Sequence, residues 1–364
     1  MTVIEFAGIG PGPFAGMMLA DQGADVIVIE RPPVQPDAPR NPMNRGKRSI
    51  VLDLKAPADR RIAWRLLERA DALVEGYRPG VMERLGFSPA AVAARNPRLV
   101  YGRITGWGQS GPLAAAAGHD LNYVALTGVT HLAAPPGSPP TLPATLIGDM
   151  GGGAMFLLYG LMCAMYSAQR TGRGQVVDAA MTDGVIALSA LTHALRAQGQ
   201  WPDDPARNQF LHGAPYFNVY ECADGRYITF GALERPFYGE MLARLGLAHV
   251  DPERQHDTAQ WPALKARIAA IVKSKSQREW CALLEGTDAC FAPVLTPAEA
   301  VAHPHHVARG AFAHVDGHAQ AAPAPRLSAS PARTPGAGTW PGEHAAQIRA
   351  WLGCSTEDNT AKPQ

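Results

Sequence analysis

Cysteine is scarce in this sequence: the 364 residues include five, at positions 163, 222, 281, 290 and 354. Their number is odd, and no two follow the C-x-x-C spacing of redox and zinc motifs. We therefore expect neither a disulfide framework nor a zinc or other metal site, and a reducing, cytoplasmic environment fits this composition. Cys163 lies in an apolar run, where the pattern favours a buried small side chain over a catalytic thiol.

Excess charge and long apolar runs are missing as well. The formal net charge is +1, so no broad basic field favours nucleic acid, and an anionic ligand must be bound by local residues. The longest apolar run, residues 154–168, is shorter than the roughly 18 residues of a membrane span, which predicts a buried helix. We recognise no signal peptide and no common C-terminal address signal, and we expect no membrane partner.

The first 110 residues alternate strand and helix patterns. Strands are predicted at residues 3–7, 25–30, 49–54, 72–75 and 99–105, and helices at residues 14–22 and 58–70. Such alternation is typical of βαβ units, and it predicts an α/β fold with a Rossmann-like, mostly parallel sheet.

The rest of the chain indicates a second, smaller domain. A long loop is predicted at residues 113–147, an apolar helix at 151–169, a strand at 175–180 and a hairpin around Asp224-Gly225. We predict a large domain at 1–198, a linker at 199–212 and a small α+β domain at 213–305. Residues 306–364 are predicted to return to the large domain and to end in a short helix.

The loop after the first strand resembles a dinucleotide-binding fingerprint. Gly10, Gly12 and Ala15 fit G-x-G-x-x-A, and Glu30 stands where a ribose-binding acid is expected. However, the fingerprint works by offering backbone N–H groups to a pyrophosphate. Pro11 and Pro13 have none, so the pattern argues against a nicotinamide cofactor.

Asp149 is the first candidate for chemistry. It precedes the apolar helix at an expected N-cap position, and Gly151, Gly152 and Gly153 follow it. A capping role with glycines that permit close packing explains this pattern on structural grounds alone. The alternative is functional, because three glycines in a first turn cost about 1 kcal/mol each against alanine and leave N–H groups open to a ligand oxygen.

His119 is the second candidate, and it lies in the segment Gly118-His119-Asp120-Leu121-Asn122-Tyr123. A lone histidine is more often structural than catalytic, and this chain has 12. Its glycine and polar neighbours place it on a tight turn before an expected helix. The spacing of the sequence does not by itself bring His119 beside Asp149.

An ordered series of segments resembles the α-methylacyl-CoA racemases, within the class III CoA-transferase (CaiB/BaiF-like) superfamily. The resemblance covers roughly residues 3 to 330. It rests on residues 5–13 (EFAGIGPGP), 44–50 (NRGKRSI), 75–81 (EGYRPGV), 105–109 (TGWGQ), 118–123 (GHDLNY), 148–153 (GDMGGG), 174–181 (GQVVDAAM), 231–234 (GALE), 292–294 (APV) and 324–326 (APR).

The resemblance implies an interlocked homodimer that binds acyl-CoA. It implies that His119 and Asp149 flank the α-carbon of the substrate, and that Glu234 of the other chain supports the histidine. It also implies CoA contacts for a set of residues at the ends of the predicted strands and in the His119 segment. These are Arg31, Leu52, Asp53, Leu54, Lys55, Gly76, Tyr77, Arg78, Arg84, Gly118, His119, Asp120, Leu121, Asn122 and Tyr123.

The function implied is racemisation of 2-methylacyl-CoA through an enolate, with CoA as part of the substrate and no further cofactor. Gly151, Gly152 and Gly153 are our candidates for stabilising the enolate oxygen. The alternative is a CoA-transferase in which Asp149 attacks the thioester, chemistry that does not require His119. A CoA-binding module without catalysis is the third possibility, and the joint presence of His119, Asp149 and Glu234 argues against it.

Overall fold

The computed structural model describes residues 1–34, 40–133 and 138–353. The chain divides into two compact units. The first comprises Met1–Val129, Leu142–Ser189 and Pro304–Gln364, and the second comprises Thr130–Thr141 and Ala190–His303. Apart from Thr130–Thr141, the second unit begins at Ala190 and the chain returns to the first unit at Pro304, whereas the sequence placed the linker at 199–212 and the return at 306.

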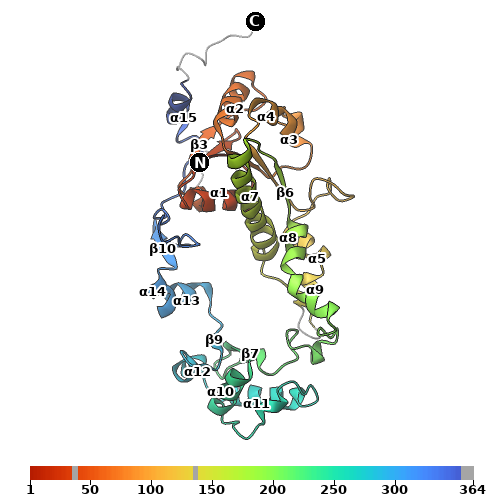
Figure 1. The fold of residues 1–364 in the computed structure, drawn as a ribbon. Helices are drawn as coiled ribbons and strands as arrows, with labels where there is room; N and C mark the ends of the chain where they lie inside the picture. Colours follow the sequence, from red (N-terminus) through yellow and green to blue (C-terminus); the bar gives the residue numbers. More distant parts are fainter. Residues whose placement is uncertain (35–39, 134–137, 354–364) are drawn as a thin grey trace. The chain divides into compact units, whose positions relative to one another are not determined.

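The first unit is built on a six-stranded parallel sheet with strand order β3-β2-β1-β4-β5-β6, which confirms the predicted α/β class (Figure 1). The direction of winding reverses between β1 and β4, and in such sheets ligands bind at the carboxyl edge near that point. The elements up to the end of α8 are β1 (Thr2–Phe6), α1 (Pro11–Asp21), β2 (Asp25–Glu30), η1 (Pro42–Asn44), β3 (Arg48–Val51), α2 (Pro57–Arg69), β4 (Ala72–Glu75), α3 (Val81–Arg84), α4 (Pro89–Arg95), β5 (Val100–Thr105), α5 (Asp120–Leu126), α6 (Val129–Leu132), η2 (Leu146–Ala154), α7 (Met155–Thr171), β6 (Val176–Ala180) and α8 (Met181–Leu188).

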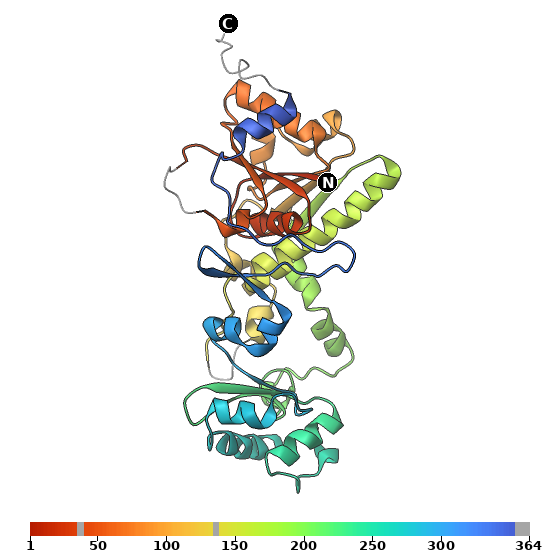
Figure 2. The same cartoon turned by 90° about the vertical axis from the view of Figure 1, so that its left-hand side faces the viewer.

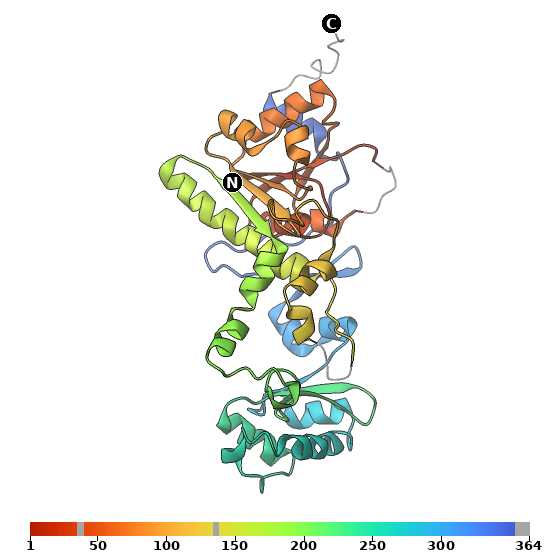
Figure 3. The ribbon, with the colours of Figure 1, turned by 90° about the vertical axis from the view of Figure 1, so that its right-hand side faces the viewer.

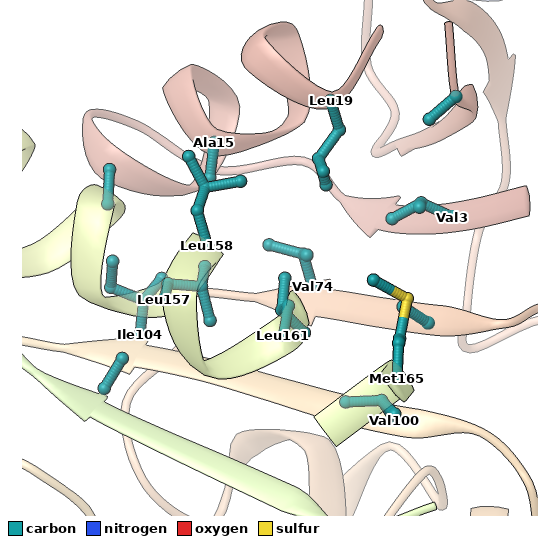
Figure 4. Packing of buried hydrophobic residues seen from close by; sticks show 14 of the residues in the cluster. Val3, Ala15, Leu19, Val74, Val100, Ile104, Leu157, Leu158, Leu161 and Met165 are labelled. Atoms are coloured by element: carbon teal, nitrogen blue, oxygen red, sulfur yellow. The ribbon is translucent and has the colours of Figure 1, made fainter. Parts of the chain in front are cut away.

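Helices α1 and α7 cover one face of this sheet. Strand side chains alternate between the two faces, so Val74 and Val100 meet the buried residues Leu157 and Leu161 of α7 (Figure 4). Gly102 lies where α7 crosses β5, and a Cβ there would stand 2.9 Å from the Leu157 side chain. The missing side chain at this position therefore allows the helix to pack directly on the strand.

Helices α2, α4 and α15 (Ala345–Leu352) cover the opposite face. Side chains from α2 and α15, such as Leu66 and Ile348, share one buried cluster with strand residues such as Ile27. Arg69 donates a hydrogen bond of 2.6 Å to the Trp351 carbonyl, so the end of the described chain lies beside α2 (Figure 2). This hydrogen bond shows that the C-terminal segment packs on the first unit.

Helix α7 continues η2 without a break, forming one helix from Leu146 to Thr171 (Figure 3). By length and composition alone it is apolar enough to cross a membrane, a test that core helices of soluble proteins also pass. The predicted burial holds for one side of the helix, whereas Tyr159 and Tyr166 on the other side are 71% and 63% exposed. The prediction for Cys163 is wrong, since its side chain is exposed on that side.

The region predicted as one long loop also contains helices. Asp120–Leu126 forms α5 and Val129–Leu132 forms α6, and η2 begins at Leu146. The short helix α6 was missed, because helix signals are weak over fewer than about eight residues. The helix after His119, which the sequence did indicate, is confirmed.

The second unit contains a three-stranded antiparallel sheet, β7-β8-β9, packed against helices around an aromatic core. The predicted hairpin is confirmed, with Gly225 at φ 77° in its turn. Its elements are α9 (Ala190–Ala197), η3 (Pro205–Arg207), β7 (Phe217–Glu221), β8 (Tyr227–Gly231), α10 (Arg235–Arg244), η4 (Pro252–Arg254), α11 (Trp261–Val272), α12 (Gln277–Leu284), β9 (Phe291–Pro293) and α13 (Pro297–Ala302). The chain then re-enters the first unit with α14 (Pro304–Arg309), β10 (Phe312–Val315) and β11 (His318–Ala321).

We expect Leu157→Ala to lower the free energy of unfolding by about 2–5 kcal/mol, because it opens a cavity between α7 and the sheet. Leu283→Ala is the matched control, since Leu283 is 49% exposed on α12. Its effect should stay within about 0.5 kcal/mol. Urea unfolding followed by fluorescence and circular dichroism checks both values, and equal effects of the two substitutions would contradict the packing described for α7.

Candidate active site

A cavity of 420 Å³ opens at the carboxyl edge of the parallel sheet, beside the point where the strand order reverses. Its walls come from the loops after β1, β4 and β5, from the start of α5 and from η2. The lining residues are Ile9, Gly10, Pro11, Gly76, Tyr77, Arg78, Pro79, Ile104, Thr105, Gly106, Trp107, Ala114, Ala116, Gly118, His119, Tyr123, Thr145, Asp149 and Met181. The fold thus brings His119 and Asp149 to one cavity, although they are far apart on the chain.

Asp149 lies inside η2, a π-helix that begins at Leu146. This corrects the sequence prediction, which placed Asp149 at the N-cap and the glycines in the first turn. The N–H of Met150 makes the first intrahelical bond, to the Thr145 carbonyl, so the N–H groups before it need other acceptors. Asp120 accepts from two of these groups: its carboxylate accepts from the N–H of Asp149 at 2.8 Å and from the N–H of Thr145 at 3.1 Å.

The Asp149 carboxyl group is held in a setting that disfavours its charge. The pKa of this group is raised to about 6. Burial is the largest cause, the negative charge of Asp120 is the second, and the charge of His119 acts in the opposite direction. Gly10, at φ 68°, faces this carboxyl group, and a Cβ there would stand 3.3 Å from Oδ2. The first glycine of the apparent dinucleotide fingerprint therefore makes room for Asp149.

His119 is the N-cap residue of α5, with extended backbone angles. Its N–H donates to Asn122 Oδ1 at 3.1 Å, which fixes the turn on which the imidazole stands. Tyr123 completes this wall, with its ring edge-on to Trp107 at 4.7 Å and its hydroxyl donating to the Gly118 carbonyl. Gly106 is required here, because a Cβ would fall 2.0 Å from the Tyr123 ring.

The predicted CoA contacts divide into two groups. Gly76, Tyr77, Arg78, Gly118, His119 and Tyr123 line the cavity. Arg31, Leu52, Asp53, Leu54, Lys55, Arg84, Asp120, Leu121 and Asn122 do not line it. Most of this second group still follows strand ends at the same edge: Arg31 directly follows β2, and Lys55 follows β3. Leu52 is buried, and Asp120 is occupied by the two N–H groups of η2.

Arg78 is the cation that lines the cavity among the described residues. Burial raises the pKa of the neighbouring Tyr77, and the positive charge of Arg31 opposes this rise. Arg31 therefore acts electrostatically at the cavity wall although it does not line the cavity. The arrangement provides positive charge beside a partly buried phenol, where an anionic group of a ligand would be favoured.

The glycine run after Asp149 does not line the cavity. Gly152 and Gly153 are buried against α8, where a Cβ on Gly152 would stand 2.6 Å from the Val185 side chain. A Cβ on Gly184 would in turn fall 1.9 Å from the Gly152 carbonyl oxygen. Close helix packing thus accounts for this glycine pattern, and an oxyanion role for Gly151, Gly152 and Gly153 stays a prediction.

Glu234 belongs to the second unit, where it is the exposed N-cap residue of α10. It comes shortly after β8. Burial raises the pKa of the Cys290 thiol, and the negative charge of Glu234 is the second cause of this rise. The support of a histidine in another chain, which the resemblance implies for Glu234, stays a prediction.

Four lining residues lie outside the segments that carry the family resemblance: Ile104, Ala114, Ala116 and Thr145. Thr145 precedes η2 with φ 66°, which is unusual for a residue with a branched side chain. Nothing in the sequence marks Thr145, whose N–H donates to the Asp120 carboxylate at 3.1 Å.

Comparison with known proteins gives a consistent relation over the whole chain. Residues 1–344 match the model of CoA-transferase family III. The chain is 40% identical over 362 residues to the alpha-methylacyl-CoA racemase of Mus musculus, covering 98% of this chain and 94% of that protein. Identity to the alpha-methylacyl-CoA racemase of Homo sapiens is 39% over 364 residues, with the same two shares covered. Among solved structures, a CAIB/BAIF family protein from Brucella suis superposes with a TM-score of 0.81 at 26% identity, covering 97% of this chain and 98% of the other.

The raised pKa of Asp149 predicts a pH dependence of stability. An aspartate in the unfolded chain titrates near 3.8, whereas Asp149 in the folded protein titrates at about 6. Between these values the folded state binds the proton more tightly, so the free energy of unfolding falls as the pH rises through this window. In Asp149→Asn this loss should disappear. Urea midpoints of both proteins between pH 4 and 7 test this, and parallel pH profiles would show that the pKa is not raised.

Proposed function

Because the chain belongs to CoA-transferase family III, we propose that it interconverts (2R)- and (2S)-2-methylacyl-CoA thioesters by moving the proton on the α-carbon. One observation carries the proposal: His119 and Asp149 line the same cavity from two different elements. The identity of 40% to a racemase over 98% of the chain supports the same reaction. The enzyme is thus proposed to be an isomerase of acyl-CoA.

Inversion at the α-carbon needs a group that removes the proton on one face and a group that supplies one on the other. In our proposal His119 and Asp149 are these two groups, and they exchange roles with the hand of the substrate. The pair must then hold a single proton in the active state. A carboxyl group with a pKa of about 6 suits this task near neutral pH, because it gains and loses its proton more evenly than an ordinary aspartate.

The enolate oxygen must also be stabilised, since the α-proton of a thioester is a far weaker acid than either partner. Gly151, Gly152 and Gly153 are our candidates for this role from the sequence, and they do not line the cavity of the described chain.

The cations around the cavity are assigned to CoA. Arg78 lines the cavity, Arg31 and Lys55 follow β2 and β3, and Arg84 is the last residue of α3, the helix after β4. Guanidinium groups suit the phosphates of CoA because they donate two parallel hydrogen bonds. The proposed proton transfer requires no redox or metal cofactor, and CoA enters as part of the substrate.

We further propose that the active enzyme is an interlocked homodimer in the cytoplasm. Met155, Tyr159, Met162 and Tyr166 leave an exposed apolar stripe along α7, of the kind that a partner chain covers. In this dimer Glu234 of one chain would support His119 of the other. The low cysteine count supports a reducing compartment.

Single substitutions should separate proton exchange from inversion. In His119→Ala, the α-proton should exchange with deuterated solvent only in the epimer whose α-proton faces Asp149. In Asp149→Ala, it should exchange only in the other epimer. Racemisation should fall by about 10² to 10⁴-fold in both variants, since each lacks one partner of the transfer. Deuterium incorporation measured separately on each epimer checks this, and racemisation at the wild-type rate in both variants would rule out the assignment.

CoA transfer is the alternative, because the matching family is named for it and Asp149 is a carboxylate at the cavity. In that reaction Asp149 attacks the thioester carbonyl, CoA leaves as a thiolate, and an acyl anhydride forms on the enzyme. The anhydride is trapped by hydroxylamine or borohydride as a modified Asp149. If Asp149 is modified during turnover and His119→Ala keeps the wild-type rate, the function is CoA transfer and not racemisation.

Mixed dimers test the assignment of Glu234. One chain carries Glu234→Gln and the other carries Asp149→Asn, with separate tags so that only hybrids are purified. If the sites are shared, one site in each hybrid combines intact His119 and Asp149 with an intact Glu234 from the partner. The hybrid should then recover about half of the wild-type activity, whereas each variant alone stays low. Activity no higher than that of the two parent variants would place Glu234 within its own chain's site or outside the mechanism.

A further inference from the structure

Asp120 is a buried carboxylate with an unusual set of partners. It is 7% exposed, and its two oxygens accept from the N–H groups of Asp149 and Thr145. These two groups belong to a different element, the start of η2, which α5 reaches only through tertiary packing. The carboxylate therefore caps a helix from outside it, satisfying donors that the π-helix cannot satisfy itself.

The surrounding backbone is shaped to admit this carboxylate. Gly148 directly precedes Asp149, and a Cβ at Gly148 would stand 2.5 Å from Asp120 Oδ1. Any side chain at position 148 would push Asp120 away from the N–H groups. Since Asp120 directly follows His119, the same two hydrogen bonds connect the backbone that carries His119 to the backbone that carries Asp149.

The charge of Asp120 is not neutralised by a nearby cation. In the part of the chain that the structure describes, its partners are the two N–H groups, and it takes part in no ion pair. The other ionisable groups facing Asp149 are His119 and Tyr123 on the α5 side and Arg78 after β4. Of the other helices packed against η2, α8 carries the exposed Asp183, while Asp21 of α1 is paired with Arg45 at 2.7 Å.

We propose that Asp120 is a positioning residue, which fixes Asp149 relative to His119 through its two hydrogen bonds and holds a proton on this pair through its negative charge. The proposal rests on the proposed racemisation, because only a proton-transfer reaction depends on the protonation of the pair. The rise in the pKa of Asp149 has the same direction, with burial as its largest cause and Asp120 as the second.

Asp120→Asn separates the two roles, because it keeps the shape and one acceptor oxygen but removes the charge. At the acid limb of the plot of exchange rate against pH, the His119–Asp149 pair passes from two protons to one. Because the negative charge that favours protonation is removed, this limb should move to lower pH by about one unit. Asp120→Ala loses both hydrogen bonds as well, so kcat should fall by about a hundredfold with little change in KM. Asp183→Asn is the matched control, since an exposed charge is screened by water and its removal should leave the acid limb in place.

The titration of Asp149 is also measured without substrate, by carbon NMR of aspartate-labelled protein with Asp149→Asn to assign the signal. A lower pKa in Asp120→Asn supports the inference even if the protein proves not to be a racemase. An unchanged Asp149 titration and an unmoved acid limb in a folded Asp120→Asn protein would overturn it. Wild-type kcat in Asp120→Ala would overturn the positioning role independently.

Discussion

The active-site geometry depends on the close packing of η2 between α5 and α8. Gly184 meets the carbonyl of Gly152 so closely that a single methyl group on it would overlap that oxygen. On the other side, Gly148 allows Asp120 to reach the N–H of Asp149. The first contact joins backbone to backbone, and the second joins the Asp149 N–H to the carboxylate of the buried Asp120, so the backbone around Asp149 is held from both sides. A larger residue at any of these glycines would move the carboxyl group relative to the cavity.

This packing also determines the charge state of the site. The π-helix places Asp149 where it is half-buried, and the cap that completes the helix is itself a carboxylate. Two acidic side chains thus approach one another for a structural reason, and the chemical consequence is that Asp149 holds its proton to higher pH. A neutral cap such as serine could satisfy one N–H group but would not have this effect. The same hydrogen bonds therefore serve the fold and the protonation of the site.

The sequence predicts the sheet well and the site only in part. Buried strands such as residues 25–30 coincide with the observed β2, because hydrophobic runs between helices have few alternatives. His119 and Asp149 were identified as residue types and through family resemblance, but their meeting depends on the tertiary packing of α5 against the start of η2. The role of Asp120 could not be predicted, since a carboxylate that caps a distant π-helix leaves no local pattern. The exposed face of α7 was missed because an apolar run does not show which side of a helix packs on the sheet.

The cavity offers groups for proton transfer and for acyl transfer, and the two reactions place different demands on the protonation of Asp149. Nucleophilic attack needs an ionised carboxylate, and burial together with the charge of Asp120 reduces the ionised fraction of Asp149 near neutral pH without removing it. Proton transfer needs a group that is neither always charged nor always neutral near pH 7, and this setting provides it. His119 adds a second proton carrier at the cavity, which acyl transfer would not require. The presence of His119 beside a carboxyl group with a raised pKa therefore supports the proposed racemisation.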